Sequence, residues 1–122
     1  EVLVERQMRQ LISAGVGDIF LVVGYRKEQF SYLASDPHIH IIENPDYFRY
    51  NNTSSLYRVL DVLDNTYICS ADHYFTENVF EPYVYRSYYA SFYGEEPTGE
   101  YYLPMRTTAL PMCRSAGSTV GI

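Results

Sequence analysis

The sequence predicts an α/β fold, with a mainly parallel sheet covered by helices on both faces. Three observations lead to this prediction. Segments with helical periodicity alternate with short apolar runs, most of the runs stop at Gly, Asn or Asp, and 47% of the 122 residues are hydrophobic. A helix–strand alternation of this kind requires crossover connections, which are right-handed and place successive strands in parallel. A chain of this length can bury one core.

The first part of the chain opens with a helix and a strand. Apolar residues recur at helical spacing over residues 1–14, and Gly15 is placed to end this helix in the left-handed conformation. The apolar run over residues 18–23, ended by Gly24, is typical of a buried parallel strand.

A second helix–strand pair follows. Residues 26–33 predict a short helix with Phe30 and Leu33 turned inward, and residues 39–43 predict a strand that ends at Asn44. A longer helix is expected over residues 52–63. Its buried stripe would contain Leu56, Val59, Leu60 and Leu63.

The next apolar run stops abruptly at a carboxylate. Residues 67–69 favour a strand covered on both faces, two small residues follow, and Asp72 then lies where the strand would end. Ligands of open α/β sheets bind outside the carboxyl ends of the strands, so Asp72 is placed for a metal or a phosphate-bearing substrate. An equally good interpretation is that Asp72 caps the next turn.

Regular structure is expected to become sparse toward the end of the chain. We expect a brief helix over residues 76–80, a tyrosine-rich strand over residues 86–93 and the start of a returning strand over residues 100–103. Prolines and glycines interrupt any pattern in residues 104–122, which predicts an irregular tail.

Composition excludes several classes of partner. A formal net charge of −6 opposes binding to nucleic acid or to an anionic membrane surface. No apolar run approaches the roughly 20 residues that span a bilayer, and no signal-peptide pattern is present. Two distant cysteines fit a reduced compartment. These observations predict a cytoplasmic protein without nucleic-acid or membrane partners.

Four segments, in this order and spacing, resemble a known family. They are residues 14–19 (AGVGDI), 22–30 (VVGYRKEQF), 50–57 (YNNTSSLY) and 70–72 (SAD). The sequence is similar to the nucleotidyltransferases with a Rossmann-like fold that activate sugar phosphates, in particular to the phosphocholine cytidylyltransferase branch of bacteria. The resemblance covers residues 1–103, and implies a Rossmann-like domain there.

The resemblance also implies a reaction. A nucleoside monophosphate would pass from a nucleoside triphosphate, expected to be CTP, to a small phosphorylated acceptor, expected to be phosphocholine, with release of pyrophosphate. Asp72 matches the family aspartate that holds Mg²⁺ against the nucleotide phosphates, and one hard cation on a carboxylate suits such a transfer.

The residues implied to contact the nucleotide are Asn44, Asn52, Ser54 and Ser55. Plain helix capping is the alternative role for Asn52 and Ser54.

Glu100 and Tyr101 resemble an acid followed by an aromatic residue, usually Trp, in the phosphocholine branch. This pair could enclose a quaternary ammonium group by charge and by cation–π attraction. The alternative is that Tyr101 is an ordinary strand residue.

Family members begin with a strand and a glycine-rich loop that precede the first residue of this chain. We therefore expect a fold that is incomplete at the N-terminus and a chain that is inactive alone. We also expect self-association, through an open sheet edge or through the tyrosine-rich strand over residues 86–93. Two other functions stay open: a sugar-1-phosphate nucleotidyltransferase, and a non-catalytic α/β module for nucleotide binding or protein interaction.

Overall fold

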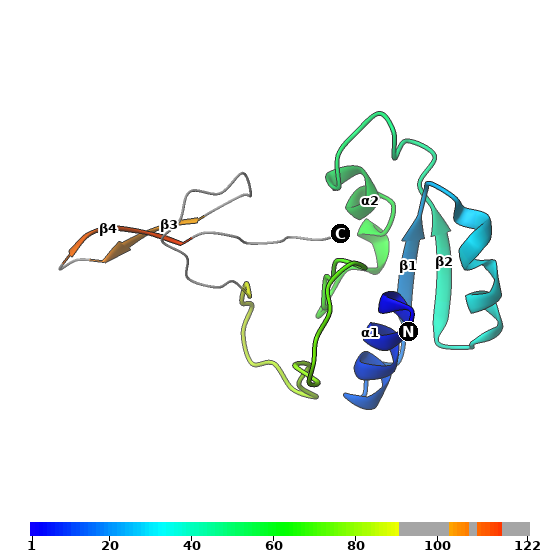
Figure 1. The fold of residues 1–122 in the computed structure, drawn as a ribbon, viewed down its shortest axis with the longest axis horizontal. Helices are drawn as coiled ribbons and strands as arrows, with labels where there is room; N and C mark the ends of the chain where they lie inside the picture. The colour runs from blue at the N-terminus through cyan, green and yellow to red at the C-terminus, as the bar shows by residue number, and fades with distance from the viewer. Residues whose placement is uncertain (91–102, 108–109, 116–122) are drawn as a thin grey trace. The chain divides into compact units, whose positions relative to one another are not determined.

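A computed structural model describes residues 1–90, 103–107 and 110–115 (Figure 1). Residues Glu1–Pro82 form one compact unit, and the described residues from Tyr83 onward belong to a second. Among the described residues, no helix is long and apolar enough to cross a membrane.

Helix α1 spans Leu3–Ser13 and confirms the predicted first helix. Its apolar stripe is buried, because Val4, Met8 and Leu11 recur at intervals of three and four residues. Gly15 has a φ of +92° and ends the helix, with its N–H bonded to the Ile12 carbonyl at 2.9 Å.

Strands β1 (Ile19–Val23) and β2 (Ile39–Glu43) lie side by side and are parallel, as predicted (Figure 1). Ile19 pairs with Ile39, and the ladder continues through the Asn44 N–H, which donates to the Val23 carbonyl at 2.8 Å. The connection between the strands is η1, a 3₁₀ helix over Lys27–Ser35. The predicted helix is therefore present, but with tighter turns than an α-helix.

One face of this sheet carries the core of the unit. Side chains two residues apart along a strand share a face, so the register places four isoleucine and leucine side chains together. They pack with α1 and with Leu33 and Phe30 of η1, both of which turn inward as expected. The residues from the strands and α1 in this core are Ile19, Leu21, Ile39, Ile41, Val4 and Met8. On the opposite face the exposed rings of Phe20 and His40 stack with centroids 5.0 Å apart.

The predicted helix over residues 52–63 is broken into two pieces. Helix α2 spans Thr53–Tyr57, and a single 3₁₀ turn, η2, spans Leu60–Val62. Val59 leaves the helical conformation, with φ −119° and ψ 12°, and it is buried. Leu60, expected in the buried stripe, is 52% exposed, because the break at Val59 rotates the next turn away from the core.

The predicted strand over residues 67–69 does not form, and Asp72 consequently does not end a strand. Within the described residues β1 and β2 pair only with each other. The segment after Tyr67 has no ladder there, and side chains of α1 bind its carbonyl groups instead. A strand requires a neighbouring strand, whatever the propensity of its residues.

The predicted helix over residues 76–80 is also absent. Side chains of α1 occupy the carbonyls of Phe75, Thr76 and Glu77. Hydrogen bonds from α1 thus satisfy carbonyl groups that a helix would have satisfied within its own backbone.

The second unit differs from the expected irregular tail over residues 104–122. Strands β3 (Leu103–Thr107) and β4 (Leu110–Ser115) pair antiparallel, with Met105 opposite Cys113. Both strands of a two-stranded ribbon are edges, which is where Pro104 and Pro111 are tolerated in a strand. Residues 86–90 are not a strand. The rest of the tyrosine-rich strand expected to Tyr93 lies outside the described residues.

Gly24 provides a test of the packing at the end of β1. A Cβ atom at Gly24 would lie 2.6 Å from Cβ and Cγ of Tyr47, too close for any real contact. We expect Gly24→Ala to lower the free energy of unfolding by about 1–3 kcal/mol, because Tyr47 must move. Urea denaturation measures this. Gly17→Ala is the matched control, since nothing lies within 4 Å of a Cβ there, and a change within about 0.5 kcal/mol is expected. Equal effects of the two substitutions would contradict the packing.

Candidate functional site

Asn44, the residue that follows β2, is 1% exposed and is the centre of the candidate site. Its side-chain Nδ2 donates to the hydroxyl of Ser54 at 2.8 Å and to the hydroxyl of Ser55 at 3.1 Å. Both serines belong to α2. One carboxamide therefore joins the carboxyl end of the sheet to this helix, and three of the predicted nucleotide-binding residues come together.

The same carboxamide also shapes the loop before α2. Asn44 Oδ1 accepts the N–H of Asp46 at 3.1 Å, and the Asp46 carbonyl accepts the N–H groups of Arg49 and Tyr50. The Asp46 carboxylate forms an ion pair with Arg58, beyond α2. The loop is thus fixed at its beginning by a local Asx turn and from its far side by a charged pair.

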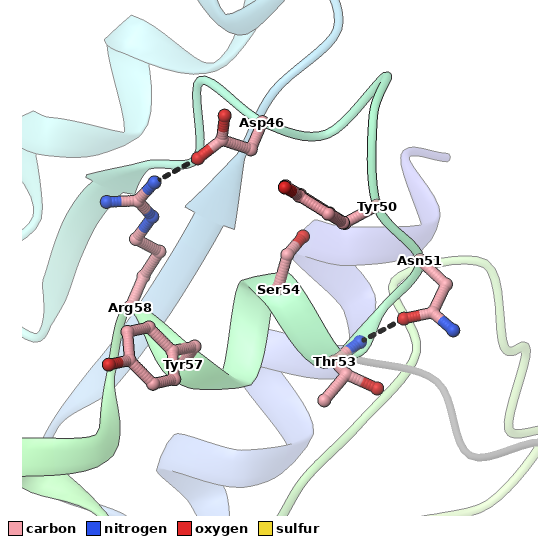
Figure 2. A pocket seen from close by; sticks show the side chains of 7 residues that line it. All are labelled: Asp46, Tyr50, Asn51, Thr53, Ser54, Tyr57 and Arg58. Carbon is pink, nitrogen blue, oxygen red and sulfur yellow. Dashed lines mark hydrogen bonds and ion pairs between the residues drawn. The ribbon is translucent and has the colours of Figure 1, made fainter.

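A hollow of about 420 Å³ lies between this loop and α2 (Figure 2). The Asp46–Arg58 pair lies at one side of it, and Asn51 and Thr53 lie at the other (Figure 2). Tyr50 and Tyr57, which are 58% and 73% exposed, supply aromatic surface. The full lining is Asp46, Tyr50, Asn51, Thr53, Ser54, Tyr57 and Arg58. Aromatic rings, hydroxyls, an amide and a charged pair can together bind a flat polar ring.

Asn52 and Ser54 do not act as plain side-chain caps of α2. The helix has no side-chain cap bond at Asn52, whose backbone carbonyl accepts from Ser55 at 3.0 Å. The Ser54 hydroxyl turns toward Asn44 instead. The exposed Asn52 side chain does not line the hollow, so the structure brings Asn44, Ser54 and Ser55 together and leaves Asn52 beside them.

Asp72 is exposed, in the loop that replaces the expected strand end. The Ser70 hydroxyl donates to its Oδ1 atom. This bond holds the pKa of the Asp72 carboxyl below its usual range, with smaller help from its own backbone N–H and from His73. The carboxylate is therefore charged at neutral pH and open to a cation.

Within the described parts of the chain, no three His, Cys, Asp or Glu side chains form a metal cluster. Mg²⁺ usually keeps several waters and binds one or two carboxylates together with substrate phosphates. A charged and exposed carboxylate such as Asp72 could supply one ligand of that kind. It does not fit a Ca²⁺ or Zn²⁺ site, which needs more protein donors.

Cys69, three residues before Asp72, has no catalytic character. Burial raises the pKa of its thiol to about 11. The thiol is protonated at neutral pH, and a protonated thiol is a poor nucleophile.

Glu100 and Tyr101 lie outside the described residues, so the acceptor site predicted for them stays a prediction. Sequence reasoning missed the hollow, and it missed three polar residues of α1, Arg6, Gln7 and Gln10, that bind the loop around Asp72. One signal was present. Gln7 lies three residues after Val4 and four before Leu11, so this polar residue interrupts a buried apolar stripe.

Comparison with known proteins identifies the chain's relatives. It is 42% identical over 101 residues to choline-phosphate cytidylyltransferase of Streptococcus pneumoniae, a match that covers 83% of this chain and 44% of the relative. It is 43% identical over 91 residues to 2-aminoethylphosphonate cytidylyltransferase of Lancefieldella rimae, with 71% and 37% covered. The chain is a homologue of the cytidylyltransferases. No family model matches it.

A solved structure of CTP:phosphocholine cytidylyltransferase from Streptococcus pneumoniae superposes on this cytidylyltransferase homologue with a TM-score of 0.78 and 39% identity. The match covers 87% of this chain and 46% of that structure. It confirms the predicted Rossmann-like α/β fold and the predicted nucleotidyltransferase family. The homologue spans less than half the length of the relatives that it matches.

The bond between Ser70 and Asp72 predicts a specific pH dependence. Ser70→Ala should raise the pKa of Asp72 toward the ordinary value of about 3.9. Because the folded pKa is the lower one, the stability contributed by this bond is present above the ordinary value and is lost as the pH falls through the folded pKa. Carbon-detected NMR titration of the Asp72 carboxyl measures the shift. Ser31→Ala, which removes an exposed hydroxyl bonded to the Glu28 carbonyl, should leave it unchanged. An unchanged pKa in Ser70→Ala would show that the serine does not hold the carboxylate.

Proposed function

We propose that this chain is part of a nucleotidyltransferase that moves CMP from CTP to phosphocholine and releases pyrophosphate. The observation that carries the proposal is homology to two enzymes with different acceptors, both named as cytidylyltransferases. Choline phosphate and 2-aminoethylphosphonate share a nitrogen-based cation and a phosphate or phosphonate group. This shared chemistry favours a small zwitterionic acceptor over a sugar phosphate.

The nucleotide would bind at the carboxyl end of β2. The Asn44 carboxamide holds α2 and the preceding loop in place, at 2.8 and 3.1 Å from the two serine hydroxyls. The tyrosine rings beside the hollow offer faces for a base, and the amide of Asn51 and the hydroxyl of Thr53 offer hydrogen bonds to its edge and to the ribose. Asn52, which is exposed beside the hollow, stays a predicted nucleotide contact. Such a preformed site would orient the triphosphate for reaction.

Asp72 would hold Mg²⁺ against the phosphates of CTP. Bound there, the cation would neutralise the charge that gathers on the triphosphate during transfer. In the reaction, a phosphate oxygen of the acceptor forms a bond to the α-phosphorus, and the bond from that phosphorus to the pyrophosphate oxygen breaks. Because the pKa of Asp72 is lowered, its carboxylate is not suited to accept a proton at neutral pH. Its role would instead be to supply negative charge to the cation and to hold the cation in position.

The acceptor cation would be enclosed by Glu100 and Tyr101, by charge and by cation–π attraction. Two alternatives stand beside this proposal. A sugar-1-phosphate nucleotidyltransferase would use the same nucleotide site with an uncharged acceptor head. A non-catalytic module would bind a nucleotide without needing a metal at Asp72.

Binding calorimetry on this chain separates the alternatives. We expect CTP to bind more tightly than ATP, and more tightly with Mg²⁺ than without it. Asp72→Asn should weaken CTP binding in Mg²⁺ by about tenfold or more, because the metal loses a charged ligand. Asp61→Asn is the matched control, an exposed aspartate on η2 that should leave the affinity unchanged.

Equal CTP affinity in Asp72→Asn and the original chain would contradict the metal role and favour the non-catalytic module. Acceptor competition decides the remaining alternative. Phosphocholine should bind in the presence of CTP, and preferential binding of a sugar 1-phosphate would identify the other enzyme class.

A further inference from the structure

We propose that Gln7 is a positioning residue that orders the loop carrying Asp72, by binding the backbone on both sides of that carboxylate. The inference rests on the proposed function for the role of Asp72, but its geometry is independent of that function. Gln7 lies in α1, and Asp72 lies 65 residues further along the chain.

The Gln7 carboxamide uses both of its Nε2 protons on this loop. Nε2 lies 2.6 Å from the Ser70 carbonyl oxygen and 2.8 Å from the His73 carbonyl oxygen. The residue is 4% exposed, so water does not readily replace either bond. The two bonded carbonyls flank Ala71 and Asp72, and the span between them is therefore fixed at both ends.

Two neighbours on the same helix extend this contact along the loop. Arg6 donates to the carbonyls of Phe75 and Thr76, each at 2.8 Å. Gln10 donates to the carbonyls of Phe75 at 3.2 Å and Glu77 at 3.0 Å. Together with Gln7 they form a row of side-chain donors on α1. The row donates hydrogen bonds to the carbonyls of Ser70, His73, Phe75, Thr76 and Glu77. No described strand pairs with this segment.

Gln7 differs from these neighbours in what its bonds control. Ser70 is both a Gln7 partner, through its carbonyl, and the donor that holds the Asp72 carboxylate, through its hydroxyl. Fixing the Ser70 backbone therefore fixes the origin of the bond that directs Asp72. Arg6 and Gln10 bind at Phe75 and beyond, so they order the loop after Asp72 and not the turn that contains it. Ordered supporting residues of this kind keep a functional carboxylate in a productive geometry.

The test compares Gln7→Met with Gln10→Met. Methionine matches the length of glutamine and removes its donors, so the two variants lose the same chemistry one helical turn apart. In Gln7→Met we expect amide hydrogen exchange within residues 71–73 to accelerate by about fivefold or more at the His73 N–H, which donates to the Ser70 carbonyl that Gln7 also binds. Gln10→Met should accelerate exchange near Glu77 and leave residues 71–73 unchanged. Equal exchange at residues 71–73 in Gln7→Met and the original chain would overturn the proposal.

Binding of Mn²⁺ provides a readout that a merely structural role would not move. NMR line broadening by Mn²⁺, alone and with CTP, should centre on Asp72 in the original chain. It should weaken there by several fold in Gln7→Met, while exposed Asp61 serves as the internal reference and the urea midpoint reports the fold. Unchanged broadening at Asp72 in Gln7→Met would show that Gln7 has a structural role only, and would overturn its assignment as a positioning residue for Asp72. If the original chain showed no broadening at Asp72, the proposed metal role would fail, and the exchange data would still decide whether Gln7 orders the loop.

If Gln7→Met does not fold, the original chain alone provides the decisive measurement. The side-chain amide protons of Gln7 should exchange with water at least about tenfold more slowly than those of exposed Gln29, because both Gln7 protons are hydrogen-bonded. Equal exchange rates for the two side chains would overturn the proposal.

Discussion

The hydrogen bonds of one buried carboxamide, Asn44, hold the candidate site together. A two-stranded parallel sheet offers few ways to fix a following helix, and the ladder itself ends at the Asn44 N–H. The side chain continues where the ladder stops, with Nδ2 on two serine hydroxyls of α2 and Oδ1 on the backbone of Asp46. A buried amide with all these partners is stable, and one that lost them would be costly. The hollow beside α2 depends on this arrangement.

A second constraint comes from the backbone between Ser70 and Glu77. Its carbonyl groups must be hydrogen-bonded wherever they are shielded from water. Polar side chains of α1 satisfy them, and in doing so they determine where the loop with Asp72 lies. The two constraints act at different places, one at the end of β2 and one along α1. Each uses side-chain amides for the role that backbone pairing has elsewhere in the fold.

The sequence predicted the first 44 residues well because their structure follows from local patterns. Helical spacing, a glycine cap and two apolar runs gave α1, β1 and β2, and homology confirms the family. Prediction was wrong where an outcome depends on distant partners. The apolar run at Tyr67 has the propensity of a strand, but it has no described neighbour with which to pair. The prolines of the tail suggested irregular structure, yet β3 and β4 form where each strand is an edge.

The part of the candidate site that could be predicted is the part that resembles the nucleotidyltransferase family. Asn44, Ser54 and Ser55 were named together for nucleotide contact, and the structure joins them through one side chain. The aromatic lining and the Asp46–Arg58 pair were missed, because no local pattern shows that a loop will fold back over a helix. Gln7 was missed too, although a polar residue in a buried apolar stripe signals a buried partner even when the partner is unknown.

If the nucleotide binds at the end of β2, as we propose, the residues that Asn44 organises must respond to it. The most direct test is an NMR titration of this chain with CTP and Mg²⁺, which follows the Asn44 side-chain amide together with the backbone signals of Asn51 and Ser54. We expect these signals to shift saturably with CTP and less with ATP, while Phe20 and His40 on the far sheet face do not respond. A well-dispersed spectrum in which CTP shifts none of the three signals would show that the nucleotide does not bind at the end of β2.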